Sequence, residues 1–300
     1  MKKRKTPGMA AQDTTVNVET KELRSITRAI LTKTKAEKII CFGSTIKNVQ
    51  HNSCFIQEKP QITLKQNSYY LLVIPAVNEL TTDIILQQKL EEAVKEIASV
   101  TIIVHRMEEI NMALQNGSSF FSAIYKNGKL LHDNDVEPFI VPTIGIAISK
   151  RISKREKFWD QWYLLSDNFL QGANFYYEKQ LNNLAVFMLH QSLQHCYSGM
   201  LKVLTGYRSN SNSLKRLLKL IDNILPESSF SPDQHTPENA RLLGLLLKGF
   251  GDARYSDKFE VTNAELNILI TRIENILKQA NTACLNHLNN LKLGKTPYIA

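Results

Sequence analysis

The sequence predicts an α+β protein in which a small mixed α/β sheet domain precedes an all-helical bundle. Two observations support this fold class. Before about residue 150, short runs rich in Val, Ile, Tyr and Phe alternate with amphipathic segments, which is typical of strands alternating with helices. After Ser149 these runs almost vanish, and five expected helices joined by short links predict an antiparallel bundle. We therefore expect a basic disordered tail over residues 1–18, the sheet domain over 19–145 and the bundle over 150–290.

The elements of the first domain follow from the period of their apolar residues. Two helices are expected, from Lys21 to about Thr34 and from Thr81 to about Ala98, because their apolar residues recur at helical spacing. Asn127-Gly128 predicts the turn of a hairpin. The β-branched and aromatic runs that predict strands are Lys38–Phe42, Tyr70–Ile74, Thr101–Val104 and Phe120–Tyr125.

The helices of the second domain are bounded by stop and start signals. Gly206 is expected to end the second of them in a left-handed conformation. Residues 226–237 contain three prolines and predict a loop. Thr262 and Glu265 match a capping box that opens the last helix. The five expected helices are Lys154–Tyr176, Glu178–Leu204, Ser213–Leu225, Pro237 to about Arg254, and Thr262 to about Asn289.

Charge and hydropathy limit the classes of protein to which this chain can belong. Lys and Arg outnumber Asp and Glu by 37 to 28, and the segment Lys2–Lys5 alone carries four of these cations. Such a tail is either a solvated terminus or a contact for phosphates. Outside the helical segments the longest uncharged stretch, Pro138–Ser149, is too short for a membrane helix, which needs about 20 apolar residues. The N-terminal residues show no apolar segment of a secretory signal, so we expect a cytoplasmic protein.

The four cysteines are widely spaced and form no Cys-x-x-Cys pair. We expect free thiols and no zinc or redox motif. His190 and His195 lie five residues apart, which places them on different faces of a helix and argues against a shared metal.

A polar stripe crosses the second helix of the bundle. His190, Gln194 and Ser198 follow one another at intervals of four residues and share one face of an otherwise apolar helix. Buried polar groups of this kind need hydrogen-bond partners or a ligand. The stripe is therefore either an interhelical network or the wall of a pocket.

Three segments of the helical half resemble a HEPN domain. They are HQSLQHCYSGMLKVLTGY, SLKRLLKLI and DARYSDKF, and the resemblance covers about residues 155–285. The resemblance implies a five-helix bundle, often dimeric, that contacts nucleotides or RNA. Family members often have an acidic residue at the position of Gln194, a lysine at Ser198 and a histidine at Asn212, and this sequence lacks all three.

Ribonucleases of the HEPN family carry an arginine followed five to seven residues later by a histidine. No arginine of this chain is followed by a histidine at that spacing, so we expect no RNA cleavage. Arg254 can still bind a phosphate or carboxylate as a fork, and Tyr255 offers a ring to a base. Alternatively, Arg254 caps the end of its helix and pairs with an aspartate.

A strand running into Gly43-Ser44 predicts a turn that exposes backbone amides to a triphosphate. With the apolar strand that follows, this turn resembles a polymerase-beta-like nucleotidyltransferase, in which the second strand bears two metal-binding carboxylates. Ser68 and Tyr70 stand at the two acidic positions, and no third acid lies within Ser99–Ile103. Hydroxyl groups cannot replace carboxylates around Mg²⁺, so we expect no nucleotidyl transfer.

The sequence thus predicts a non-catalytic protein that binds a nucleotide or RNA, forms a homodimer and needs no metal or cofactor. Two alternatives remain open. One is an RNA-processing or nucleotide-transferring enzyme of the toxin and antitoxin type with atypical residues, and the other is a structural dimerisation module. The candidate nucleotide-binding residues are Gly43, Ser44, Ser68, Tyr70, His190, Gln194, Arg254 and Tyr255.

Overall fold

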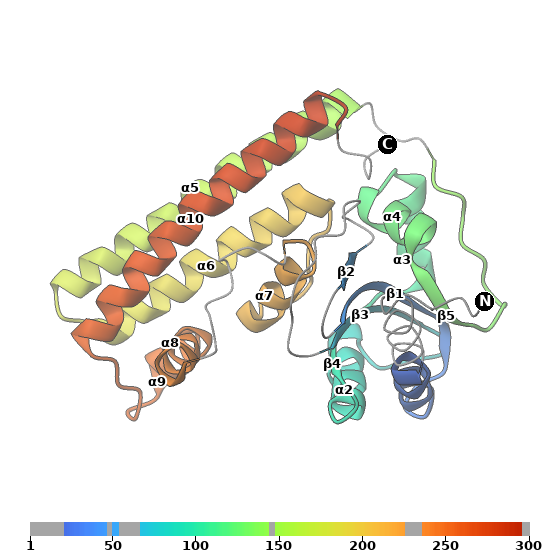
Figure 1. Ribbon diagram of the computed structural model, residues 1–300, viewed down its shortest axis with the longest axis horizontal. Coiled ribbons are helices and arrows are strands. Elements are labelled where there is room, and N and C mark those ends of the chain that lie inside the picture. The colour runs from blue at the N-terminus through green and yellow to red at the C-terminus, as the bar shows by residue number, and fades with distance from the viewer. Residues whose placement is uncertain (1–20, 47–49, 54–66, 144–147, 226–235, 296–300) are drawn as a thin grey trace, which may run out of the picture. The chain divides into compact units, whose positions relative to one another are not determined.

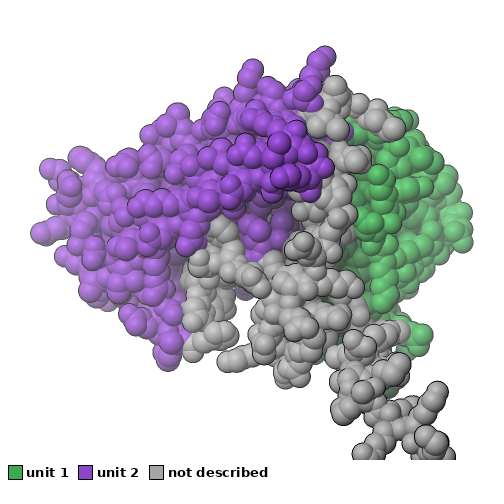
Figure 2. Space-filling model, turned by 45° about the horizontal axis from the view of Figure 1, so that its top comes forward, with its two compact units in different colours: residues 1–145 green, residues 146–300 purple. Residues whose placement is uncertain are grey.

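The computed structural model describes residues 21–46, 50–53, 67–143, 148–225 and 236–295. The predicted tail over 1–18 and nearly all of the predicted loop over 226–237 lie outside these residues. The chain forms two compact units, residues 1–145 and 146–300, which are coloured separately in Figure 2.

Unit 1 contains a mixed sheet whose order is β2-β1-β3-β4, with β5 also paired to β1. The pairs of β1 with β2, β3 and β5 are antiparallel, and β3 with β4 is parallel. The first part of the long strand β1 lies between β3 and β5, and its second part lies between β3 and β2. Three predicted strands are confirmed with longer bounds. The strands are β1 (Ala36–Ile46), β2 (Gln50–Ser53), β3 (Ser68–Pro75), β4 (Ser99–Val104) and β5 (Lys129–Asp133).

Helices cover both faces of this sheet (Figure 1). Side chains from a helix over residues 21–31 and from α2 (Asp83–Val94) share one core cluster with alternate residues of β1 and β3, such as Ile39 and Leu71. On the other face, the ring of Phe42 lies 5.9 Å from that of Phe120 in α4 (Ser119–Asn127). The short helix α3 (Met107–Gln115) precedes α4. Because both faces are covered, seven of the eight residues of β3 are buried.

The predicted strand Phe120–Tyr125 and the hairpin after it are wrong, because these residues form α4. The hydroxyl of Ser118 accepts the Phe121 N–H as an N-cap, and Phe120, Ala123 and Ile124 are buried at helical spacing. Gly128 ends the helix with φ −69° and is not in a turn with positive φ. A Cβ there would lie 2.5 Å from the Ile124 carbonyl oxygen, so close packing is what requires glycine at this position.

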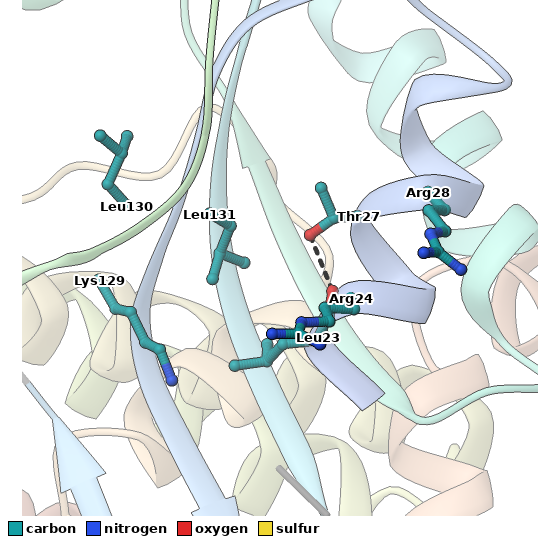
Figure 3. Close-up of a pocket in the computed structure, with 7 residues that line it drawn as sticks. All are labelled: Leu23, Arg24, Thr27, Arg28, Lys129, Leu130 and Leu131. Carbon is teal, nitrogen blue, oxygen red and sulfur yellow. Dashed lines mark hydrogen bonds between the residues drawn. The ribbon is translucent and has the colours of Figure 1, made fainter. Parts of the chain in front are cut away.

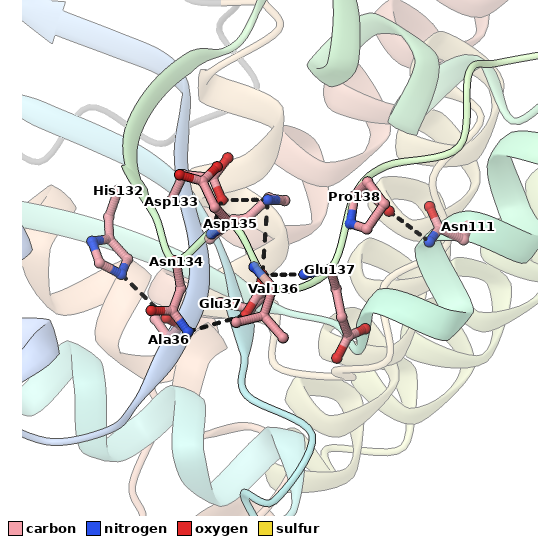
Figure 4. A network of polar contacts seen from close by, with 11 residues as sticks. Ala36, Glu37, Asn111, His132, Asp133, Asn134, Asp135, Val136, Glu137 and Pro138 are labelled. Atoms are coloured by element: carbon pink, nitrogen blue, oxygen red, sulfur yellow. Dashed lines mark hydrogen bonds and ion pairs between the residues drawn. The ribbon is translucent and has the colours of Figure 1, made fainter.

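A buried carboxylate fastens the segment after β5 to the sheet (Figure 4). Glu37 of β1 is 2% exposed and accepts the backbone N–H groups of Val136 and Glu137 at 3.0 and 2.7 Å. The neighbouring Lys38 forms an ion pair with Asp133 at the end of β5. These contacts hold the end of β5 and the residues after it against β1.

Unit 2 is helical, and three long helices pack together as its frame (Figure 1). They are α5 (Ile148–Glu178), α6 (Asn182–Thr205) and α10 (Asn263–Lys292). The other helices among its described residues are α7 (Leu214–Asp222), α8 (Pro237–Lys248) and the single turn α9 (Asp252–Tyr255). Gly206 ends α6 with φ 85°, and both hydrogen bonds of the Thr262–Glu265 capping box are formed, so these two predictions are confirmed.

The predicted fourth helix begins at Pro237 as expected, but it does not run to Arg254. It ends at Lys248, and α9 follows after three residues. Gly249 packs against α6 so closely that a Cβ would lie 3.1 Å from the side chains of His190 and Val186. The break therefore brings the C-terminal end of α8 directly onto the polar stripe of α6.

Two further predictions bear on the described residues. None of the helices that the structure describes is long and apolar enough to span a bilayer. Cys196 and Cys284 are buried free thiols, as predicted, Cys41 is also buried, and Cys54 lies outside the described residues.

Candidate nucleotide-binding cleft

A cavity of about 920 Å³ opens within unit 2. Its walls come from α5, the middle of α6, the segment between α6 and α7, the first residues of α7, and the C-terminal end of α8 with the residues after it. The polar, charged and aromatic residues that line the cavity include Trp162, His190, Gln191, Gln194, His195, Arg208, Asn212, Ser213, Lys215, Lys248, Phe250 and Asp252.

His190 lies at the inner wall of the cavity and is only 4% exposed. Its Nδ1 is 2.7 Å from the Leu246 carbonyl oxygen, which can only accept, so Nδ1 carries the proton and donates. Burial lowers the pKa of His190, the charge of Arg254 lowers it further, and the hydrogen bond acts in the opposite direction. The imidazole is therefore neutral at pH 7, and its Nε2 is a hydrogen-bond acceptor.

Two amides on α6 face the cavity without protein partners. Gln194 is 9% exposed and makes no hydrogen bond to any residue in the described parts of the chain. The Oε1 atom of Gln191 is also buried without a partner among those residues. Buried polar groups are nearly always paired, so the Gln191 Oε1 atom is unusual, and the Gln194 amide, which is not fully buried, can bond to a polar group that enters the cavity. This geometry supports the pocket-wall interpretation of the polar stripe over an interhelical network.

Positive charge dominates the rim of this cavity. Arg208, Lys215 and Lys248 line it, whereas Asp252 is the only carboxylate among its lining residues. The N-terminus of α7 adds to this field, because Ser213 is an extended N-cap without a side-chain cap bond and the first turn carries no acid. The first N–H groups of a helix have no partner within it and favour an anion there. An anionic group in the cavity therefore meets both side-chain cations and a helix N-terminus.

An aromatic wall lies beside this charge. The ring of Trp162 lies 5.2 Å from that of His195, and the guanidinium of Arg208 lies 6.0 Å from the Trp162 ring. His195 Nδ1 donates to the Gln191 carbonyl oxygen at 2.7 Å, which fixes the ring orientation. The helical spacing of His190 and His195 predicted different faces, yet both imidazoles line the same cavity. The cavity is wide enough to reach two adjacent faces of α6.

Arg254 is not the open fork that the sequence suggested. Its guanidinium carbon lies 4.2, 4.7 and 4.9 Å from the ring centroids of Phe250, Tyr255 and Phe187, and its Nε donates to the Phe250 carbonyl oxygen at 2.5 Å. It forms no ion pair with a described aspartate. Phe250 follows the end of α8 and precedes α9, so this bond does not cap the C-terminal end of either helix. The aspartate pairing of the capping alternative is also absent among the described residues. Tyr255 is 79% exposed, so one face of this cation–aromatic stack points to solvent.

The candidate residues of unit 1 lie next to one another, but they do not form a phosphate cradle. Gly43 and Ser44 lie inside β1, where they pair with β2 on one side and with Tyr70 and Tyr69 of β3 on the other. The predicted turn is therefore wrong, because a bulge between Cys41 and Gly43 lets β1 continue to Ile46. Ser44 and Tyr70 are buried, and Ser68 opens β3 opposite Thr45.

No group of three His, Cys, Asp or Glu side chains that could hold a metal is found over the described ranges.

The residues around the cavity lie in a part of the chain that matches a known protein family. The HEPN domain family model matches residues 159–282. This match covers fewer than half of the residues of the chain, includes all of the cavity residues named above, and confirms the HEPN part of the resemblance. A search among curated proteins found no match.

Several cavity residues were not singled out from the sequence. Arg208, Lys215 and Lys248 come from three separate elements, so no linear motif joins them. The sequence places Trp162 only within the expected helix Lys154–Tyr176. The available signal was the basic character of the residues that flank the turn between α6 and α7, next to a polar stripe on α6.

Proposed function

We propose that the HEPN region of this protein is a non-catalytic module that binds a nucleotide or RNA in the cleft beside α6. The observation that carries the proposal is the combination of the unpartnered Gln194 amide with three cations and the N-terminus of α7 around one cavity. Phosphate oxygens fit the cations and the helix N-terminus. The amides of Gln191 and Gln194 and the acceptor Nε2 of His190 suit the polar edge of a base.

Binding is tested by titration calorimetry of the full chain with a panel of ribonucleotides and with short single-stranded RNAs. We expect Lys215→Gln to weaken binding, and Lys278→Gln to leave it unchanged, because Lys278 is an exposed lysine of α10 that does not line the cavity. Binding to RNA should weaken as salt rises, since released counterions drive contacts to phosphates. No binding across the panel would refute the proposal.

Cleavage of RNA is a second candidate function, and one observation favours it. His190 and His195 both line the cavity with Arg208 and Lys215, so imidazoles lie beside groups that can hold a phosphate. Histidine is the most frequent general acid or base. Incubation of the protein with labelled RNA tests this candidate. Turnover that is lost in His195→Ala and also falls in Arg254→Ala would replace the non-catalytic proposal.

We infer that unit 1 is a degenerate polymerase-beta-like nucleotidyltransferase domain. Its mixed sheet supports this inference, because Ser68 and Tyr70 lie at the start of β3, where members of that family carry metal-binding carboxylates. Gly43 and Ser44 have no phosphate-binding role in this proposal because they are paired within the sheet. Incubation with labelled ATP, Mg²⁺ and RNA or protein acceptors is expected to give no transfer, and any transfer would contradict the inference.

We also propose that the protein is a homodimer. HEPN domains are often dimeric, and α5 presents exposed apolar side chains at Leu164, Leu165 and Phe175, which are 60%, 39% and 54% exposed. Light scattering coupled to gel filtration is expected to give twice the chain mass of 34.2 kDa. A monomer at high micromolar concentration would contradict this proposal, and it would also argue against the structural dimerisation alternative.

A further inference from the structure

A second concave surface lies within unit 1, in the groove between the helix over residues 21–31 and the first residues of β5 (Figure 3). The groove has a volume of about 320 Å³. Its polar lining consists of Arg24, Thr27, Arg28 and Lys129, and its apolar lining consists of three leucines.

The sequence places these cations by helical spacing and strand pairing. Leu23, Ile26 and Ile30 are buried against the sheet, so Arg24 and Arg28, which are four residues apart, share an outer row of the helix. Lys129 pairs with Cys41 of β1, which brings it to the same groove from the sheet.

The charges of this groove are not compensated by the protein. No carboxylate lines it, and none of the three cations forms an ion pair or a side-chain hydrogen bond with the residues that the structure describes. Like charges at a spacing of four residues destabilise a helix. The groove therefore has a local electrostatic cost, which an anion in the groove would remove.

We propose that this groove binds a small organic phosphate, independently of the cleft in unit 2. A phosphate monoester carries a charge of about −2 and three acceptor oxygens, so it can satisfy several cations at once, whereas a carboxylate carries a single charge. The guanidinium groups of Arg24 and Arg28 offer paired donors for such oxygens. The side chains of Leu130 and Leu131 provide an apolar surface for the organic part of the ligand.

The test measures the binding of inorganic pyrophosphate to the full chain by titration calorimetry and by thermal unfolding. Pyrophosphate is expected to bind saturably, and acetate at the same concentration is not. Arg28→Gln and Lys129→Gln should each weaken pyrophosphate binding at least tenfold. Lys33→Gln is the matched control, because Lys33 is an exposed cation of unit 1 outside the groove.

A second control separates this groove from the cleft in unit 2. Lys215→Gln should leave the pyrophosphate affinity unchanged if the probe binds in unit 1. In the absence of ligand, Arg28→Gln should unfold at the same temperature as the unaltered protein or a higher one, because it removes repulsion. Absence of saturable binding, equal binding by Arg28→Gln, or loss of binding in Lys215→Gln alone would overturn the proposal.

Discussion

The substitution Gln194→Leu tests whether the Gln194 side chain binds a ligand or stabilises the fold. Gln194 as a whole is 9% exposed and its amide has no hydrogen-bond partner among the described residues, so the folded protein gains no hydrogen bond from it. Leaving a buried polar group unsatisfied costs about 1–3 kcal/mol. Because the side chain borders a cavity that water can enter, we expect Gln194→Leu to stabilise unit 2 by about 1 kcal/mol, the lower end of that range.

The same substitution should weaken ligand binding. A neutral hydrogen bond contributes about 0.5–1.5 kcal/mol, so the loss of one bond from the Gln194 amide to a nucleotide corresponds to a roughly twofold to tenfold higher Kd. Thermal unfolding and titration calorimetry on the same preparation measure both quantities. A higher unfolding temperature together with a weaker affinity is the expected pair of results.

A partnered amide in the same unit provides the matched control. Asn281 accepts the indole N–H of Trp159 at 2.9 Å, and Trp159 is 1% exposed. Asn281→Leu leaves that buried donor without a partner, so we expect a destabilisation of about 1–3 kcal/mol. If Gln194→Leu destabilises the protein to the same extent, Gln194 belongs to a structural network and the argument for the cleft fails.

Three further substitutions test packing and electrostatics. Thr262→Ala removes the N-cap of α10 and should lower the free energy of unfolding by about 1 kcal/mol in a urea titration, whereas Thr262→Ser should retain it. The hydrogen bond from Arg241 lowers the pKa of Glu265 to about 2, so its contribution to stability is present above pH 5 and is lost as the pH falls towards 2. Glu265→Gln should therefore flatten the stability profile over that range, and an unchanged acid slope would refute this assignment. Gly128→Ala places a Cβ 2.5 Å from a carbonyl oxygen and should cost about 1–3 kcal/mol, while Gly244→Ala, with open space around its Cα, should be neutral or stabilising.

The helical half could be predicted well because its signals are local. The capping box at Thr262, the left-handed Gly206 and the start of α8 at Pro237 depend only on residues within a few positions of each other. The predictions were wrong where tertiary packing decides the secondary structure. An apolar run such as Phe120–Tyr125 has the composition of a strand, and only the burial of Phe120, Ala123 and Ile124 against the sheet distinguishes it as a helix.

By itself, the sequence determined the division into a sheet domain and a helical domain, most element boundaries in the second, and the polar stripe on α6. Only the tertiary structure decided that this stripe borders a cavity, because Arg208, Lys215 and Lys248 approach it from separate elements. It also decided that Gly43 and Ser44 lie within a strand and that Arg254 packs against three rings. Strand pairing and contacts between helices join residues that are far apart in the chain, and no local pattern records which of them meet.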